Sequence, residues 1–429
     1  MQIKLNTFKK NKRMESVWER IMTYNKGRMP DMMTKKLAAM QANIFGFYRG
    51  TCHLYSEDYK AHFKFKDNSR IWSCGDLHFE NFGTYKAFDR KVYFDINDFD
   101  EGVLAPLSFD VIRLITSFYV VAIQVKMQEK KAALLANCIY NSYYKVIQKG
   151  KPINGSKSIR STMIRKLISK VEKRSEKELL KKRVKFSKTP KLRIIQDSSI
   201  EISNDLKNQL IGKINKWSVK KGHRFTCLDV AFRMAGTGSL GIKRYITLLQ
   251  NKQTKKYMLV DVKEAMPSCV DRSLHQKQPK WKNEASRVVH VQNKTQYRPP
   301  HLLNTLHFDK SWYVIKELQP MQDKVDITQS INKIKMLEQA TDDMGEITAS
   351  GQLRTCGYKG ADSVKMIQKH VKKNIALRSA VLDYAFSYSK QVNTDYKEFC
   401  ASMEKNAAFL ASKPEKKRIN VKKGNIANK

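Results

Sequence analysis

Apolar residues recur at near-helical spacing in several parts of the chain. They do so from residue 1 to about 48, from Phe109 to Val125, from Leu134 to Ile147, and again from Ile331 onward. A stripe of apolar positions three to four residues apart is typical of helices that bury one face. The two glycines of Phe45-Gly46-Phe47-Tyr48-Arg49-Gly50 interrupt the first pattern. We therefore predict that the first helical pattern breaks at 45–50.

Strand patterns appear between these helical segments. Apolar and polar residues alternate from Val92 to Asn97, and Ile71-Trp72-Ser73-Cys74 is a short apolar run. A longer strand-rich block spans about 227–325, where the β-rich runs Tyr245–Leu249 and Tyr257–Val262 flank a polar turn. Alternation with period two predicts strands, and a polar turn between two of them predicts a hairpin. The fold class predicted is α+β.

Shifts in composition divide the chain into five parts. We predict the N-terminal part of a helical lobe over 1–148, a basic connector over 149–224, and a β-rich lobe over 225–325. A C-terminal helical part would cover 326–412, and a basic, disordered tail would cover 413–429. The connector keeps an apolar stripe from Ile164 to Val171, so we expect it to be packed.

The net charge of +42 comes from 82 Lys and Arg against 40 Asp and Glu. Such a field attracts nucleic acid and phosphorylated ligands, but no recognised nucleic-acid module accompanies it. We favour a solvated surface and keep nucleic-acid binding as the minority interpretation. The seven cysteines contain no CxxC pair, and there is neither a secretory signal pattern nor an apolar run long enough to span a bilayer. We expect a cytoplasmic protein with reduced thiols and no membrane span.

An acid and an amide five residues apart carry the first chemical signal. They are Asp76 and Asn81 in the segment Gly75–Gly83, and this is the spacing of a kinase catalytic loop. Asp76 would accept the proton of an attacking hydroxyl and Asn81 would hold Mg²⁺. The alternative is a loop whose short polar side chains cap backbone groups. We expect a structural role for His78, and we expect Asp110 to cap its helix or brace the loop.

A carboxylate cluster follows the predicted strand at 92–97. Asp98 stands where that strand ends, so we predict that it holds Mg²⁺ against nucleotide phosphates. Asp95 is the reserve candidate. We expect Asp100 and Glu101 to face solvent or to support the ligands.

A glycine-rich segment and a lysine could supply the nucleotide site. The segment Gly236-Thr237-Gly238-Ser239-Leu240-Gly241 lies between predicted strands, as the phosphate-covering loop of kinases does. We predict that Gly236, Gly238, Ser239 and Gly241 contact phosphates. A later strand carries Lys263, which would hold the α- and β-phosphates. A buried lysine needs an anionic partner, and Glu284 is the partner that we predict.

Together these motifs resemble the uncharacterised bacterial family catalogued as domain of unknown function 2252. The resemblance covers about 35–400 and rests on Phe47–Gly50, Gly75–Gly83, Phe94–Glu101, Gly236–Gly241, Val262–Ala265, Arg287–Val289 and Tyr384–Tyr396. That family looks related to the protein-kinase-like superfamily, nearest the aminoglycoside and choline phosphotransferases. The resemblance implies a two-lobed fold that binds ATP and Mg²⁺. Because Asp76 precedes Gly236, whereas kinases have the opposite order, the lobes would be circularly permuted.

The leading hypothesis is therefore an ATP- and Mg²⁺-dependent phosphotransferase acting on a hydroxyl of a small molecule or protein. One alternative is a nuclease or phosphoesterase in which Asp76, Asp95, Asp98 and Asp100 bind two cations. The other is a nucleotide-binding protein without transfer activity, because this chain reads Ala349-Ser350-Gly351 where the family tends to carry a histidine. We also expect Lys316–Gln319 to be the hinge that contacts adenine.

Overall fold

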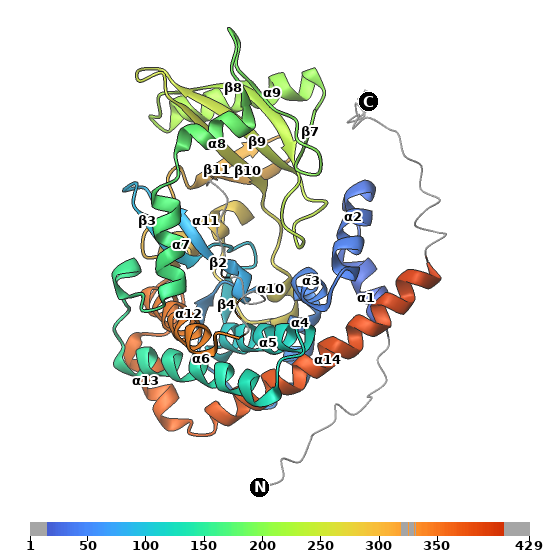
Figure 1. The fold of residues 1–429 in the computed structure, drawn as a ribbon, viewed down its shortest axis with the longest axis vertical. Coiled ribbons are helices and arrows are strands. Elements are labelled where there is room, and N and C mark those ends of the chain that lie inside the picture. The colour runs from blue at the N-terminus through green and yellow to red at the C-terminus, as the bar shows by residue number, and fades with distance from the viewer. Residues whose placement is uncertain (1–14, 319–324, 326–329, 331, 407–429) are drawn as a thin grey trace.

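A computed structural model describes residues 15–318, 325, 330 and 332–406. The helices and strands form two parts, a strand-rich part and a larger helical part (Figure 1). The prediction of an α+β fold is confirmed, whereas a kinase-like fold and a circular permutation stay predictions. The tail predicted at 413–429 lies outside the described residues.

The helical part contains most of the helices of the chain. Its helices are α1 (Val17–Tyr24), α2 (Pro30–Gln41), α3 (Ile44–Gly50), α4 (Cys52–His62), α5 (Ser108–Gln124), α6 (Glu129–Lys149), α7 (Thr162–Glu172), α10 (Cys269–Leu274), α11 (Glu284–Thr295), α12 (Ile334–Arg354), α13 (Val364–Lys373) and α14 (Leu377–Lys405). α12 packs on α6, and α14 packs on α5. The apolar face of α5 is buried along nearly its full length, so α5 is the central helix of this core.

Two small antiparallel pairs carry the acidic motifs within the helical part. β1 (Ile71–Ser73) pairs with β4 (Val103–Ala105), and β2 (Phe82–Lys86) pairs with β3 (Val92–Ile96). A 3₁₀ turn, η1 (Phe79–Asn81), precedes β2. The predicted strands at 71–74 and 92–97 are therefore present.

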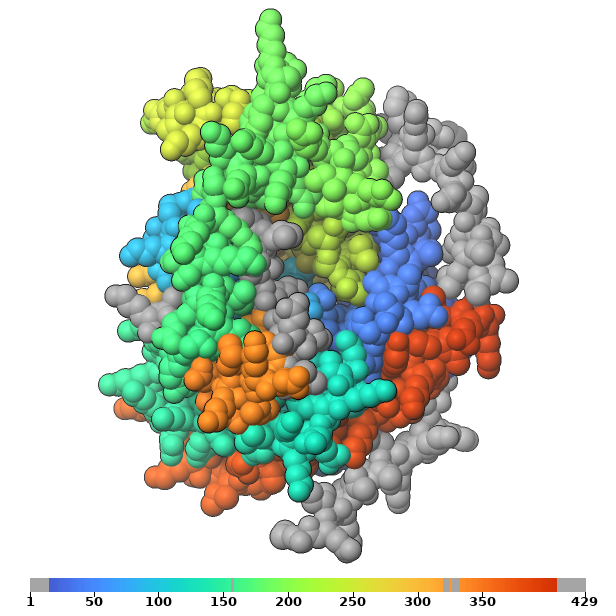
Figure 2. Space-filling view, in the orientation of Figure 1, coloured from blue at the N-terminus to red at the C-terminus, as the bar shows by residue number. Residues whose placement is uncertain are grey.

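The strand-rich part is a six-stranded antiparallel sheet in the order β11-β12-β10-β9-β8-β7. The strands are β7 (Ser199–Ile200), β8 (Phe225–Arg233), β9 (Arg244–Asn251), β10 (Tyr257–Glu264), β11 (Asn304–Phe308) and β12 (Ser311–Glu317). Helix α9 (Asn204–Lys220) shares one apolar cluster with the sheet. A second cluster joins the sheet to α8 (Glu176–Arg183) and the short pair β5 (Val184–Lys185) and β6 (Lys191–Leu192). Figure 2 shows the strand-rich part, in green and yellow, above the helical part on this face.

The boundaries of these parts differ from the five predicted ones. The segment predicted as a connector at 149–224 is packed, as expected, but α7 joins the helical core while β7 and α9 join the sheet. The segment predicted as a β-rich lobe at 225–325 includes α10 and α11, whose apolar residues belong to the helical core. Chain order does not separate the two parts because elements of one are inserted between elements of the other.

The predicted break at residues 45–50 is wrong, since these residues form α3. Asn43 caps the helix by accepting a hydrogen bond from the Gly46 amide over 2.7 Å, which is a common way to start a helix. A β-carbon at Gly46 would lie 2.6 Å from the Ala39 carbonyl oxygen, and one at Gly50 would collide with Met40. The two glycines therefore permit close packing of α3 on α2.

The seven cysteines are all free thiols, as predicted. No helix among the described residues is both long enough and apolar enough to cross a bilayer.

Candidate active site

The segment from Gly75 to Asn81 connects β1 to β2 as a compact loop. Gly75 has a φ of +84°, and a β-carbon there would lie 2.3 Å from the Glu101 carbonyl oxygen. Both the left-handed backbone and the close approach require glycine. The carboxylate of Asp110, near the start of α5, accepts hydrogen bonds from the Cys74 and Gly75 amides over 2.8 and 3.1 Å. Asp110 thus braces the loop, which is one of the two roles predicted for it.

Asp76 is held by a buried arginine from α5. Nε of Arg113 donates to Oδ1 of Asp76 over 2.8 Å, and Nη2 donates to the same oxygen. Burial raises the pKa of Asp76 to about 6, against the opposing effect of Arg113. A carboxyl group with a pKa in this range is well matched to accepting a proton near neutral pH. Arg113 interrupts the otherwise apolar α5 and was not among the predicted site residues, although a cation in such a position signals a buried partner,.

Asn81 and His78 support the loop in different ways. The Asn81 side-chain amide donates to the Asp76 carbonyl oxygen, which leaves its oxygen as the remaining polar atom. The Asn97 amide donates to the Asn81 carbonyl oxygen over 2.8 Å and so ties the loop to the end of β3. His78 is buried, with its ring edge-on to Phe45, which agrees with the structural role predicted for it.

Asp98 and Asp100 follow β3 and face the sheet. Lys263 on β10 forms an ion pair with Asp100, so a contact joins residues that are far apart in the chain. Burial would raise the pKa of Asp98, but Lys263 and Lys316 outweigh it and hold this pKa below its ordinary value. Burial and the neighbouring Asp98 raise the pKa of Asp100 instead. Asp98 therefore has the lower pKa of the two and is the better cation ligand, since Asp100 is already paired with Lys263,.

The partner predicted for Lys263 is wrong. Glu284 accepts a hydrogen bond from Nε of Arg287 over 2.7 Å, three residues later on α11. Lys263 instead contacts Asp100, which was expected to face solvent or to support the metal ligands. The Arg287 guanidinium also donates to the carbonyl oxygens of Asp100 and Gly102. Glu284 thus positions an arginine that supports the acidic loop.

Asp95, the reserve metal candidate, lies elsewhere. Its carboxylate accepts hydrogen bonds from the Ile96 and Tyr297 amides over 2.8 and 3.0 Å, and Arg354 lies 3.6 Å away. In the nuclease or phosphoesterase alternative, Asp95 would bind cations together with Asp76, Asp98 and Asp100. Asp95 lines neither of the two cavities near the acidic residues, whereas the other three line the same one. This arrangement favours Asp98 over Asp95 as a metal ligand.

The glycine segment joins β8 to β9 and descends from the sheet toward α2 and α3 (Figure 1). Gly236 and Gly241 have φ values of +79° and +89°. Arg28 donates to the carbonyl oxygens of Gly238 and Leu240 over 2.8 and 2.6 Å. The loop is thus held through its carbonyl groups by residues from the beginning of the described chain. Neither the sequence motif nor its spacing indicated this clamp.

Two adjoining cavities meet at the acidic residues and the glycine loop. The catalytic-loop cavity, of about 430 Å³, is lined by Asp76, and the sheet cavity, of about 300 Å³, is lined by Lys263. The residues that line both are Arg49, Asn81, Asp98, Asp100, Gly236 and Ser239. The parts predicted to form one site therefore come together, although their segments lie far apart in the chain.

The sheet cavity combines a charged floor with an apolar wall. Arg233 and Arg244 both pair with Asp261, over 2.7 and 2.8 Å, and Lys316 lies opposite Asp261 on the neighbouring strand. Arg244 and Arg233 hold the pKa of Asp261 well below its ordinary value although burial acts in the other direction. The apolar wall consists of Leu179, Val288, Val314 and Leu318. A floor and wall of this kind can receive a ligand that has both anionic and apolar parts.

The adenine hinge predicted at Lys316–Gln319 begins at the end of β12 and stays a prediction. Lys316 and Glu317 belong to β12, and the Leu318 amide donates to the Leu259 carbonyl oxygen over 2.8 Å. Gln319 lies outside the described residues. The segment Ala349–Gly351, which departs from the family pattern, is buried within α12 and lines neither cavity.

A family described as an uncharacterised protein conserved in bacteria, DUF2252, matches residues 28–402. The chain belongs to the DUF2252 family. The match includes the loop Gly75–Asn81, the acidic cluster, the glycine loop and Lys263, so most of the residues that line the two cavities lie within the family region. No curated protein and no solved structure matches the chain.

Proposed function

We propose that this DUF2252 protein is an ATP- and Mg²⁺-dependent phosphotransferase whose acceptor is a hydroxyl group. One observation carries the proposal. Asp76 lines only the catalytic-loop cavity, Lys263 lines only the sheet cavity, and Asp98 lies at their border. In this proposal the proton acceptor and the phosphate-binding cation lie in separate cavities, and the metal ligand lies between them. Transfer of a phosphoryl group between two bound substrates requires this arrangement.

In this proposal the nucleotide occupies the sheet cavity. The apolar wall would receive the base, and Lys263, Arg244 and Lys316 would face the phosphates. The glycine loop would cover the phosphates at the border, because its glycines allow backbone amides to approach them closely. Kinase-like architecture with permuted lobes is part of the proposal, and the contact between Lys263 and Asp100 supplies the proximity that it requires.

The residues at the border fit a magnesium ion. Asp98 offers an ionised carboxylate, and Asn81 offers an amide oxygen whose amide nitrogen is already engaged. Within the described residues no three His, Cys, Asp or Glu side chains converge on one metal position. This agrees with Mg²⁺, which takes one or two protein ligands and completes its shell with phosphate and water oxygens. Bound there, Mg²⁺ would neutralise charge on the phosphates.

Asp76 acts as the proton acceptor in this reaction. The acceptor oxygen forms a bond to the γ-phosphorus while the bond between that phosphorus and the β,γ-bridging oxygen breaks. The hydroxyl proton passes to Asp76, and ADP carries away the electrons of the broken bond. Arg113 keeps the Asp76 carboxylate oriented, so little reorganisation accompanies the proton transfer.

Calorimetric titration with ATP and Mg²⁺ tests the nucleotide half of the proposal. Lys263→Met should weaken ATP binding about tenfold or more, because a charge-assisted contact to phosphate is lost. Lys256→Met is the matched control, since Lys256 is exposed just before the same strand. A wild-type protein that does not bind ATP would refute the proposal.

Transfer of label from γ-labelled ATP to a metabolite extract tests the reaction itself. Asp76→Asn should abolish transfer while leaving ATP binding in place. Unchanged transfer by this variant would remove Asp76 from the role of base. ATP binding without transfer to any acceptor would favour the alternative of a nucleotide-binding protein without activity.

A further inference from the structure

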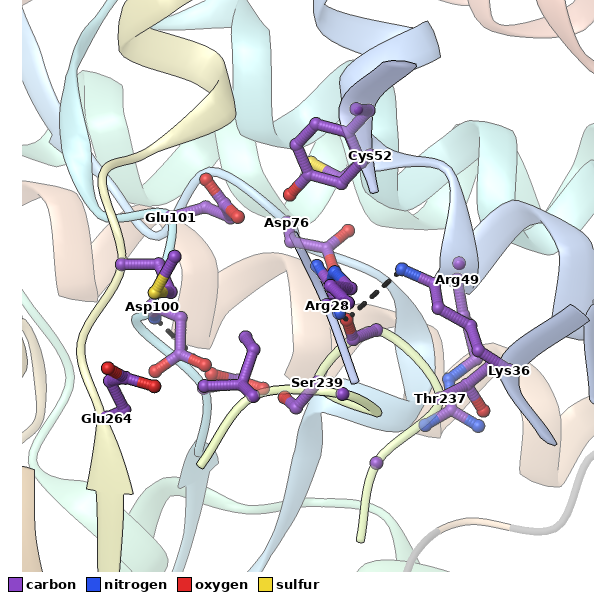
Figure 3. A pocket seen from close by; sticks show the side chains of 18 of the residues that line it. Arg28, Lys36, Arg49, Cys52, Asp76, Asp100, Glu101, Thr237, Ser239 and Glu264 are labelled. Atoms are coloured by element: carbon purple, nitrogen blue, oxygen red, sulfur yellow. Dashed lines mark hydrogen bonds between the residues drawn. The ribbon is translucent and has the colours of Figure 1, made fainter. Parts of the chain in front are cut away.

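The catalytic-loop cavity has an acidic side and a basic side. Figure 3 shows Asp100, Glu101 and Glu264 on one side and Lys36 and Arg49 on the other. The acidic side is already engaged. Besides the pair of Asp100 with Lys263, Glu101 accepts from the Cys269 amide over 2.7 Å and Glu264 accepts from the Ser311 hydroxyl over 2.6 Å.

The basic side contains two cations, Lys36 and Arg28, whose contacts are with neutral oxygens and with the Tyr24 ring. Lys36 is 0% exposed, and its amine donates to Oδ1 of Asn25 over 2.8 Å and to the Gly238 carbonyl oxygen over 3.3 Å. Arg28 donates to two carbonyl oxygens of the glycine loop. In the part of the chain that the structure describes, no carboxylate pairs with either side chain. Burial and the neighbouring Arg28 lower the pKa of Lys36 well below its ordinary value, because a buried cation without an anion is unfavourable. An anionic ligand in the cavity would favour the protonated amine and be stabilised by it.

Three more cations line the same cavity. Lys26 and Arg272 are exposed and Lys243 is half-buried, and among the described residues none of them pairs with a carboxylate. Together with Lys36 and Arg28 they add positive charge around the cavity, although Lys243 lies beside Glu264, which accepts a hydrogen bond from the Lys243 amide over 3.2 Å. Asp76 lines the same cavity, so a ligand can reach both the base and the cations.

We propose that the acceptor carries a carboxylate or phosphate group in addition to its hydroxyl. The inference rests on the proposed function, since it names the substrate class of the same site. The hydroxyl would face Asp76. The anionic group would lie against the cations of the same cavity, which are Lys36, Arg28, Lys26, Lys243 and Arg272. A cationic alcohol would meet like charge on this side of the cavity and bind more weakly.

Binding of four small probes to the ATP-free protein tests the inference. The probes are glycerate and glycerol 3-phosphate, with glycerol and choline as neutral and cationic matches, each followed by protein NMR. We expect one or both anions to bind at least about tenfold more tightly than glycerol and choline. Choline binding more tightly than both anions, or no preference for either anion over glycerol, would overturn the inference.

Variants locate the bound anion. The double variant Lys243→Ala with Arg272→Ala should weaken anion binding about tenfold, whereas Lys252→Ala with Lys256→Ala removes the same charge from an exposed turn and should not. Lys36→Met, checked for folding by its thermal melting, should also weaken binding. Lys263→Met should leave anion binding in place. Equal effects of the two double variants would refute the location.

The outcomes separate this inference from the proposed function. Anion binding that depends on Lys243 and Arg272, in a protein that does not bind ATP, would refute the phosphotransferase and leave an anion site standing. ATP binding without an anion preference would refute the acceptor class alone.

Discussion

Replacing Arg113 by methionine should raise the pKa of the Asp76 carboxyl group. Arg113 is 0% exposed, and Asp76 keeps 23% of its side chain exposed. At an effective dielectric constant of about 20, unit charges about 4 Å apart attract each other by about 4 kcal/mol. Solvent at the Asp76 side screens part of this attraction, so we take about half, roughly 2 kcal/mol. Because about 1.4 kcal/mol changes proton affinity tenfold, the pKa of Asp76, about 6 in the native protein, should exceed about 7 in the variant.

The same substitution increases the pH dependence of stability that Asp76 causes, since its pKa in the native protein is already above the ordinary value,. The unfolded chain ionises Asp76 near its ordinary pKa of 3.8, whereas the folded variant would ionise it only above about 7. Folding then binds a proton between these values, so the variant loses stability as the pH rises through this range. Urea denaturation at pH 5 and pH 8 should show a cost of Arg113→Met that is larger at pH 8 by roughly 2 kcal/mol.

Titration of ¹³C-labelled aspartate by NMR measures the pKa without any substrate, and Asp76→Asn assigns the signal. Arg160→Met is the control, because Arg160 pairs with Asp343 and Glu346 and lines neither cavity. An Asp76 pKa in Arg113→Met within about 0.3 of the wild-type value would refute the electrostatic reasoning.

Two further substitutions test the supports of the site. Gly75→Ala should destabilise the protein by about 3 kcal/mol or more in urea denaturation, because it combines a left-handed φ with a collision against Glu101,. Gly212→Ala, in open space within α9, should be neutral or stabilising, and similar effects of the two would contradict this account. Asp261→Asn should lower the free energy of unfolding at pH 7 by about 2 kcal/mol or more. The reason is that Arg233 and Arg244 lose the carboxylate that they share. Asp261 has a depressed pKa, so its contribution is present above the unfolded pKa and disappears in acid; a difference from wild type that fails to shrink below about pH 4 would refute the assignment.

The local features of the site could be predicted because each depends on neighbouring residues. The end of β3 follows from alternation, and it places Asp98 beyond the strand. The glycine loop between two strands follows from the β-rich runs on either side of Gly236–Gly241. Patterns of this kind report local backbone preference, which the folded chain preserves here.

The partners of these residues could not be predicted in the same way. Lys263 pairs with Asp100, 163 positions earlier in the chain, and no periodicity reports contacts over such a distance. Glu284 is closer to Lys263 in the sequence than Asp100 is. It forms an ion pair with Arg287, one helical turn away, and not with Lys263,. A positive charge in an apolar helix, as at Arg113, is a sign of a buried anion, but no partner was predicted for it, and only the packing of α5 beneath the loop identifies Asp76 as that anion.

The long helix α14 is synthesised after all the segments that form the site, because it follows them in the chain. It packs on α5, its Glu398 carboxylate accepts from the Val17 amide over 2.9 Å, and its Tyr396 hydroxyl donates to the Gln41 carbonyl oxygen over 2.7 Å. A chain emerging from the ribosome has its catalytic loop, acidic cluster and glycine loop long before α14 arrives to cover the core beneath them. Until then the apolar surface of α5 lacks its partner, which opposes stable folding. The core beneath these segments would therefore become stable only after α14 has been synthesised, and chains that stop before α14 would lack this support.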